Sequence, residues 1–152
     1  VHECCVKGNV NMLKTLLPFI ENINTLDQHQ QNAAHICCIY GELECLKLLA
    51  ANGIDLEQRD SLGLQPFHLA AKHNWPEIIE FLFDMGVSID KQCTSGKLAF
   101  HYAAEFGSFD TLRKMCEYYI DLSIPDNQGN TVAHLAAKND HLECVKHLIK
   151  LG

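Results

Sequence analysis

Histidines close to paired cysteines are the residues of this chain whose types could perform chemistry. His2 stands two residues before a Cys-Cys pair, and so does His35. Imidazole and thiolate are common ligands of Zn²⁺, which needs about four of them at ~2.0–2.3 Å from one point. A metal site is therefore the first hypothesis that these residues raise.

The spacing of the histidines argues against such a site. Five of them recur every 33 residues, at positions 2, 35, 68, 101 and 134. A fixed period in this range indicates a stacked array of repeats. Equivalent residues of stacked neighbours lie a helix-packing distance apart, about 8–10 Å, which is too far to share one ion. We therefore interpret each histidine as a structural residue whose ring ties the loops of adjacent repeats, and we expect no metal and no cofactor.

Other residue types that serve catalysis lack the sequence context that catalysis needs. No serine lies in a glycine-flanked elbow, and no glycine-rich phosphate loop occurs. Asp27, Asp60 and Asp126 recur at the starts of turns, where aspartate hydrogen-bonds the local backbone. We expect no catalytic residues and no enzymatic activity from this segment.

Each repeat is predicted to contain a turn, a helix A, a tight turn, a helix B and an extended loop. In the second copy, helix A ends near Tyr40, and helix B spans 43–51 with apolar residues at helical spacing. Pro66 and Pro76 suit the first positions of the two helices in the third copy, where no backbone donor is needed. The predicted copies cover 1–26, 27–59, 60–92, 93–125 and 126–152.

The fourth copy departs most from this pattern. Cys93 replaces the aspartate of the other copies, and Leu98 stands where threonine caps helix A of the fifth copy. Tyr119 stands where glycine ends helix B in other copies. Because a tyrosine with positive φ is costly, we predict an altered loop over 118–125.

The chain resembles the ankyrin repeat family over essentially its whole length. That family repeats a 33-residue unit containing Thr-Pro-Leu-His-x-Ala. Residues 65–70 (Gln-Pro-Phe-His-Leu-Ala) keep the Pro, His and Ala, and residues 131–136 (Thr-Val-Ala-His-Leu-Ala) keep the Thr, His and Ala. No copy keeps every element. The resemblance implies an all-α solenoid of stacked helix-turn-helix repeats, joined by β-turns and extended loops.

Composition limits the kinds of partner. The chain has 152 residues, of which 47 % are apolar, and a formal net charge of −7 without a cluster of lysine or arginine. A duplex-binding surface needs concentrated positive charge, so we expect no nucleic acid partner. The apolar runs are too short to span a membrane and no signal segment begins the chain, so we expect no membrane insertion.

The eight cysteines are predicted to be reduced thiols. Most occupy repeat positions where other copies carry apolar residues, and free cysteine packs as a small apolar side chain. The distance between equivalent residues of stacked repeats exceeds the ~7 Å between Cα atoms that a disulfide tolerates. Reduced thiols indicate an intracellular, cytoplasmic protein.

Protein binding is the function that the resemblance implies. Ankyrin repeat proteins act as scaffolds and adaptors and bind partners on the concave face formed by the turn tips and the exposed side of helix A. Several residues that align with this face are apolar or aromatic, as at interaction sites. We predict a face that binds a protein or peptide and comprises Tyr40, Arg59, Leu62, Leu64, His73, Lys97, Tyr102 and Phe106. Tyr102 has a second interpretation as a core residue, because the aligned positions hold isoleucine and leucine.

Other interpretations stay open. The array is alternatively a structural segment of a larger channel, enzyme or signalling protein, or a homo-oligomeric scaffold joined through its ends. Neither end carries the polar cap of terminal repeats, which predicts a window of a longer array with flanking repeats or domains.

Trp75 and Asn24 each suggest a role of their own. Trp75 either staples the inter-helix turn onto a neighbouring repeat, which we favour, or forms an exposed contact. Asn24 lies in the loop where, as the resemblance implies, ankyrin repeat proteins can carry a hydroxylated asparagine.

Overall fold

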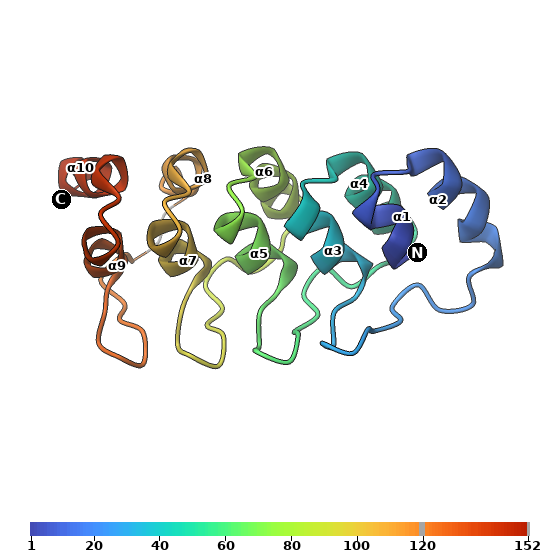
Figure 1. Ribbon diagram of the computed structural model, residues 1–152, viewed down its shortest axis with the longest axis horizontal. Coiled ribbons are helices and arrows are strands. Elements are labelled where there is room, and N and C mark those ends of the chain that lie inside the picture. Colours follow the sequence, from blue (N-terminus) through green and yellow to red (C-terminus); the bar gives the residue numbers. More distant parts are fainter. Residues whose placement is uncertain (119–120, 152) are drawn as a thin grey trace.

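The computed structural model describes residues 1–118 and 121–151, which form successive pairs of short helices (Figure 1). The first helices of the pairs are α1 (His2–Val6), α3 (Ala33–Tyr40), α5 (Pro66–Lys72), α7 (Ala99–Glu105) and α9 (Val132–Lys138). The second helices are α2 (Val10–Leu16), α4 (Leu43–Ala51), α6 (Pro76–Asp84), α8 (Phe109–Met115) and α10 (Leu142–Leu151), with a 3₁₀ turn at Leu17–Phe19. No strand occurs in these residues, and the predicted all-α solenoid is confirmed.

The helices form two layers, and the loops project away from both of them. In Figure 1 the first helices make the middle row and the second helices lie above them. The loops that precede α3, α5, α7 and α9 project below, and we call these loops the fingers. Within the first layer α3 packs on α1 and α5, and α7 packs on α5 and α9. Each repeat therefore contacts its sequence neighbours, and the chain ends lie at opposite ends of the stack.

Small buried side chains allow the first helices to approach one another closely. Ala70 and Ala71 in α5 have no exposed surface, and neither do Cys37 and Cys38 at the equivalent positions of α3. Helices of this length are unstable alone in water, so their stability comes from packing. Cysteine thus serves here as a slightly larger alanine, as predicted from its repeat position.

Trp75 joins the turn between α5 and α6 to the preceding repeat. Its indole Nε1 donates a hydrogen bond to the carbonyl of Ile39 at 3.4 Å. The ring also lies against Gly41, where a Cβ atom would come within 2.7 Å of it. The predicted packing role of Trp75 is therefore confirmed.

The same junction recurs further along the chain with other side chains. Ser108 Oγ donates to the carbonyl of Lys72 at 2.9 Å, and His141 Nε2 lies 2.9 Å from the carbonyl of Glu105. Carbonyls in the last turn of a helix lack partners within the helix. At the ends of α3, α5 and α7 a donor from the next repeat supplies that partner.

The loop fingers are tied to one another through their backbones. One amide donates to the preceding finger at each junction, from Ser61, Thr94 and Asn127 to the carbonyls of His29, Leu62 and Ser95, at 3.0, 3.1 and 3.0 Å. The fingers therefore form a continuous, fixed edge of the array.

The fourth repeat differs at the end of its second helix. Helices α4 and α6 have nine residues each, whereas α8 has seven and ends at Met115. The ring of Tyr118 then stacks on Phe83, with 3.7 Å between ring centroids. Tyr119, which motivated the predicted altered loop, lies outside the described residues.

Gly41 offers a test of the junction, because its φ of +80° and its contact with Trp75 both exclude a side chain. We expect Gly41→Ala to lower the free energy of unfolding by roughly 2–4 kcal/mol, through backbone strain and overpacking. Gly53 is the matched control, since its φ is +83° and its Cβ position is open. Gly53→Ala should cost only about 1 kcal/mol. If urea unfolding shows that the two substitutions lower the free energy of unfolding equally, the contact between Gly41 and Trp75 does not stabilise the junction.

Candidate functional site

The central histidines hold the starts of the first helices. In four repeats the ring Nδ1 lies within hydrogen-bond distance of the backbone N–H of the N-cap residue three positions earlier, in the pairs Asn32–His35, Gln65–His68, Leu98–His101 and Thr131–His134, at 3.3, 3.2, 3.0 and 3.1 Å. A nitrogen that accepts this bond carries no proton. The neutral ring therefore has its proton on Nε2, which can donate to another group.

That second nitrogen reaches the following repeat. The Nε2 atoms of His2 and His35 lie 3.0 and 3.1 Å from the carbonyls of Gln31 and Leu64 in the next repeat, and that of His68 lies 2.9 Å from the carbonyl of Lys91 in the loop that ends its own repeat. The predicted role of the histidine rings in tying the loops of adjacent repeats is confirmed for His2 and His35. His101 Nε2 is buried and has no hydrogen-bond partner in residues 1–118 and 121–151. These same ranges contain no group of three or more His, Cys, Asp or Glu residues that could hold a metal ion.

Burial keeps these rings neutral. It lowers the pKa of His35 and His101 below the usual value, and that of His68 from 6.5 to about 4. The bond to the Lys91 carbonyl opposes the shift at His68 but is outweighed. A charged ring would also lose the acceptor that holds the N-cap N–H.

The helix A face is our name for the surface formed by the finger tips and the C-terminal ends of α3, α5, α7 and α9. Tyr40, His73 and Phe106 occupy the same repeat position on it, at or just past the ends of three successive first helices. Tyr40 and Phe106 are each 50 % exposed, and Leu62 at a finger tip is 60 % exposed. The His73 ring is also exposed. These four predicted residues thus lie on one face.

Arg59 is exposed beside the same finger. Its Nη1 donates to the carbonyls of Gly63 at 3.3 Å and Gln92 at 2.9 Å. The side chain therefore joins the loop that begins the third repeat to the loop that ends it, while its charge stays in solvent.

Leu64 does not belong to this face, and its predicted exposure is wrong. Only 6 % of the residue is exposed, and it packs in the hydrophobic core. Its amide donates to Asp60 Oδ1 at 2.9 Å, and its carbonyl accepts from His35. Closure of the turn therefore brings Leu64 against the helices.

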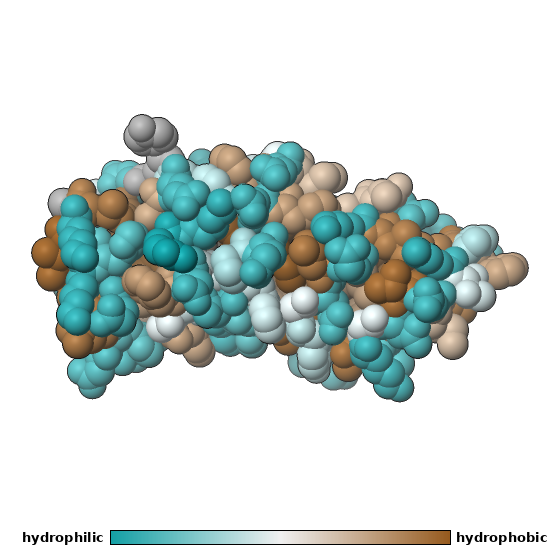
Figure 2. All heavy atoms as spheres, turned by 90° about the horizontal axis from the view of Figure 1, so that it is seen from above, coloured by the Kyte–Doolittle hydropathy of each residue, from teal (hydrophilic) through white to brown (hydrophobic). Residues whose placement is uncertain are grey.

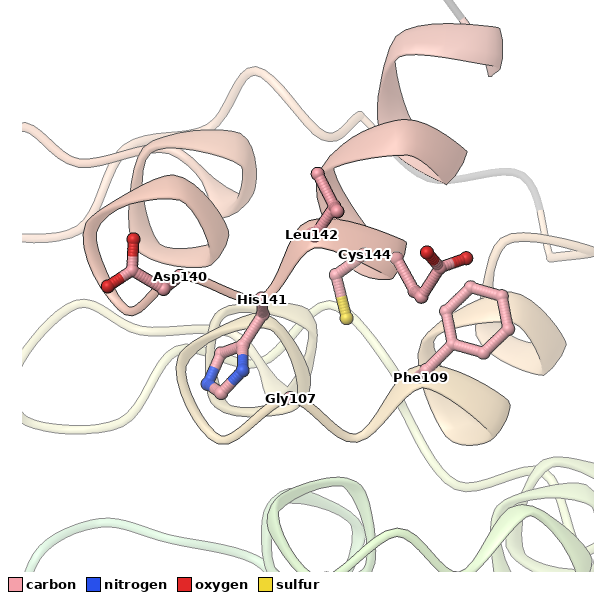
Figure 3. Close-up of a pocket in the computed structure, with 7 residues that line it drawn as sticks. Gly107, Phe109, Asp140, His141, Leu142 and Cys144 are labelled. Atoms are coloured by element: carbon pink, nitrogen blue, oxygen red, sulfur yellow. The ribbon is translucent and has the colours of Figure 1, made fainter.

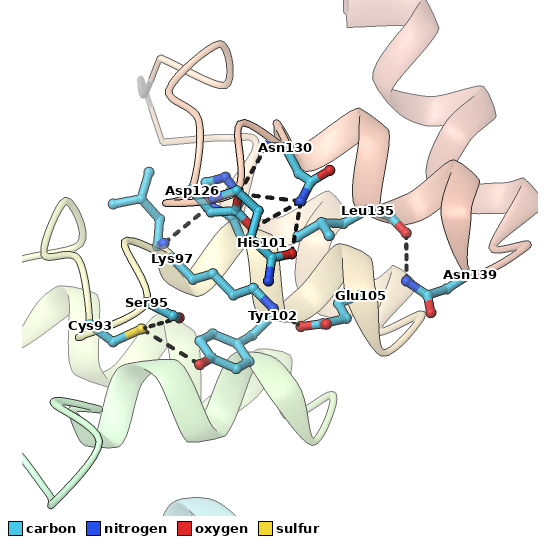
Figure 4. A network of polar contacts seen from close by, with 12 residues as sticks. Cys93, Ser95, Lys97, His101, Tyr102, Glu105, Asp126, Asn130, Leu135 and Asn139 are labelled. Carbon is cyan, nitrogen blue, oxygen red and sulfur yellow. Dashed lines mark hydrogen bonds and ion pairs between the residues drawn. The ribbon is translucent and has the colours of Figure 1, made fainter.

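Tyr102 is partly buried, in agreement with its interpretation as a core residue. Its ring packs partly against the core, and its hydroxyl lies 3.5 Å from Cys93 Sγ (Figure 4). Burial, together with the bond to Cys93, raises the pKa of the hydroxyl. The ring stacks on Phe106 with 6.5 Å between centroids, so it supports an exposed aromatic residue of the face.

Cys93 has taken the place of a turn aspartate. In other copies the aspartate oxygen accepts backbone amides, as Asp60 does from Leu62 and Leu64. Burial raises the pKa of the Cys93 thiol, but hydrogen bonds led by that of Ser95 outweigh burial and leave the pKa below its usual value. Sequence reasoning noted this substitution but had no means of pairing the thiol with Tyr102.

Two lysines lie over aromatic rings of the face. Lys97 Nζ pairs with Glu105 at 2.7 Å and lies 5.5 Å from the centroid of the Tyr102 ring (Figure 4). Lys72 Nζ lies 4.7 Å from the centroid of the Phe106 ring. Lys72 therefore holds a cation beside aromatic surface, whereas the Lys97 side chain is only 16 % exposed and is paired with Glu105.

Asn24 lies at a junction between loops. Its Oδ1 accepts from the amide of Asp55 at 2.7 Å, and its Nδ2 lies 3.4 Å from the carbonyl of Gly53. One repeat later Glu57 accepts from the amide of Ser88 at 2.8 Å. The position thus has a structural role, and hydroxylation of Asn24 stays a prediction.

A shallow pocket of about 320 Å³ lies between the inter-helix turns of the fourth and fifth repeats (Figure 3). Its lining residues are Gly107, Phe109, Asp140, His141, Leu142, Glu143 and Cys144. The His141 ring already contacts the Glu105 carbonyl, and Cys144 is 1 % exposed. The imidazole of this pocket therefore serves the junction between repeats, and Glu143 pairs with Lys146 at 2.9 Å.

The layer of second helices presents a different surface. Seen from that side, the molecule is mostly hydrophilic, with apolar surface in separate patches and at the end where α10 lies (Figure 2). Leu142, Ile149 and Leu151 of α10 are 60, 73 and 52 % exposed. No helix in the described ranges is both long and apolar enough to cross a membrane.

Comparison with known proteins agrees with this geometry. The chain matches the family model described as ankyrin repeats (3 copies) over residues 1–93 and again over residues 67–152. The two matches together span the chain. No curated protein matches it.

The lowered histidine pKa values predict a pH-dependent stability. Between pH 4 and 6.5 the unfolded chain binds more protons than the folded chain. The free energy of unfolding is therefore larger at pH 6.5 and decreases as the pH is lowered towards 4. For His68 the lowered pKa corresponds to a loss of roughly 3 kcal/mol in the free energy of unfolding, because one pKa unit is worth about 1.4 kcal/mol. Urea unfolding at a series of pH values measures it.

Substitution at single histidines identifies the source of this dependence. His68→Gln should flatten the curve between pH 4 and 6.5, because glutamine does not titrate. His134→Gln is the control, since that ring is exposed. Identical pH slopes for wild type and His68→Gln would contradict the assignment.

Proposed function

Because the chain belongs to the ankyrin repeat family, whose repeats are generally protein–protein interaction modules, we propose that it binds a protein or peptide on its helix A face. The observation that supports this most is the exposure of Tyr40, Leu62 and Phe106 together on that face. Half-exposed apolar residues on one face mark interaction surfaces, and aromatic residues dominate their energetics. In this proposal the array acts as a scaffold or adaptor and performs no chemistry.

Rigidity supports the proposal. Hydrogen bonds from histidine rings join neighbouring loops, and backbone bonds join neighbouring finger tips. A surface that is already ordered loses little conformational entropy on binding. The tyrosine and phenylalanine side chains are then held at a spacing set by the repeat.

Cysteine chemistry supports a reducing compartment. All eight cysteines are free, and all except Cys116 are buried. Burial raises the pKa of Cys38, Cys45 and Cys144, which makes these thiols poor nucleophiles. We therefore propose an intracellular, cytoplasmic location.

Thiol labelling checks the redox state. Iodoacetamide added to protein unfolded in urea without reductant should modify all eight cysteines, as measured by intact mass. Labelling before unfolding should be slow at the seven buried positions, because the folded chain shields them. A mass that shows fewer than eight modified residues after unfolding would indicate disulfides.

Substitution of the two exposed aromatic residues tests the binding face. Tyr40→Ala with Phe106→Ala should weaken capture of the partner from lysate by about 30-fold or more, as for loss of interface hot spots. The free energy of unfolding should change by only about 1 kcal/mol, since both side chains are half exposed. Phe19, 82 % exposed in the 3₁₀ turn, provides the control. Phe19→Ala should leave capture unchanged, and capture that survives the double substitution would overturn the proposal.

A further inference from the structure

The charges on the layer of second helices are largely paired. Arg113 and three of its lysines lie near carboxylates, in the pairs Lys47–Glu44, Lys114–Glu80, Lys114–Glu117, Lys146–Glu143 and Arg113–Asp110, at 2.8, 2.9, 3.1, 2.9 and 3.9 Å. Lys14 and Lys150 form no ion pair within residues 1–118 and 121–151. Most cations of this side of the molecule are therefore paired.

The helix A face differs in this respect. Lys72 ends α5, Lys138 ends α9, and Arg59 lies beside a finger. Within residues 1–118 and 121–151, none of these three cations pairs with a carboxylate. They stay unneutralised in a chain whose formal net charge is −7.

Carboxylates of this face are already engaged. Asp60 and Asp126 are only 8 and 6 % exposed, and each accepts backbone amides of its own turn. Glu105 pairs with Lys97, and its side chain is 27 % exposed. The exposed charge around the end of α5 is therefore positive, whereas at the end of α9 Lys138 lies two residues before the exposed Asp140.

Lys72 and Phe106 form a composite site. The lysine ammonium lies 4.7 Å from the centroid of a phenylalanine ring that is half exposed. The contact fixes a cation next to apolar surface, a pairing that suits a carboxylate adjacent to an apolar side chain. Lys138 holds the same repeat position two repeats further on. At about 8–10 Å per repeat, the two lysines lie roughly 16–20 Å apart, or about five to six residues of extended chain.

We propose that the partner of the helix A face is an extended acidic segment of a protein. One carboxylate binds Lys72, a neighbouring apolar side chain packs on Phe106, and a second carboxylate five to six residues away binds Lys138. The inference rests on the proposed binding function and adds the chemistry of the partner. Because the whole chain is acidic, acidic peptides have no general attraction to it, and their binding reports this face.

A selection from a phage-displayed library of random 12-residue peptides tests the proposal. Peptides enriched on the wild-type chain should contain Asp and Glu at least twice as often as the starting library, with pairs five to six residues apart. The same selection on Lys72→Glu should lose that enrichment. The best acidic peptide, labelled with fluorescein, should bind the wild-type chain with an affinity measurable by anisotropy.

Matched variants then locate the contact. Lys72→Gln should weaken binding of that peptide about threefold to fivefold, as for loss of one interface charge. Lys114→Gln, which removes a paired lysine of α8, should leave the affinity unchanged. Equal effects of the two substitutions would overturn the proposal, and so would tighter binding to vesicles of phosphatidylserine and phosphatidylcholine than to the peptide.

The outcomes separate this inference from the proposed function. Enriched peptides that are not acidic but lose affinity on Phe106→Ala would overturn the acidic partner and leave the binding face intact. Enriched peptides that are unaffected by Tyr40→Ala with Phe106→Ala would overturn the face itself. A selection that enriches no sequence would overturn the inference, while capture of a partner from lysate would still test the function.

Discussion

A neutral imidazole held between two repeats is the interaction on which the rest of the structure depends. In each complete repeat Nδ1 faces the N-cap amide, which fixes the start of a first helix. In His2 and His35, Nε2 also reaches a carbonyl of the next repeat. One side chain therefore sets both local helix geometry and the spacing between repeats. Its two bonds require an uncharged ring, and burial supplies that condition.

A second set of contacts acts at the other end of the first helices. There the donor changes from an indole at Trp75 to a hydroxyl at Ser108 and an imidazole at His141, but the acceptor is always a carbonyl near the end of the preceding first helix. Unsatisfied carbonyls at a helix end are costly when shielded from water. The repeat keeps the bond and varies the residue that makes it. The scaffold is thereby fixed, and surface positions are free to differ between repeats.

Charge is divided between the two sides of the array in the same way. Ion pairs with nearby carboxylates neutralise most of the cations on the second helices, as for Lys47 and Lys146. On the helix A face the turn carboxylates accept hydrogen bonds from backbone amides, as at Asp60 and Asp126. The local folding of the turns therefore leaves Lys72 and Lys138 without carboxylates, although the chain as a whole is acidic. A binding preference can arise in this way without any dedicated charged cluster in the sequence.

The sequence by itself determined the period, the helices and the role of the histidines. A repeat of 33 residues fixes which positions are equivalent, and the proline and glycine positions fix the ends of helices such as α4 and α6, because local backbone chemistry decides both. Only the tertiary structure decided that Leu64 turns inward, that Tyr102 meets Cys93, and that Lys72 lies over Phe106. These contacts join side chains of different types across a turn or between neighbouring repeats. Alignment places a residue in the repeat, but closure of the turn and the shape of the adjacent repeat decide where its side chain goes.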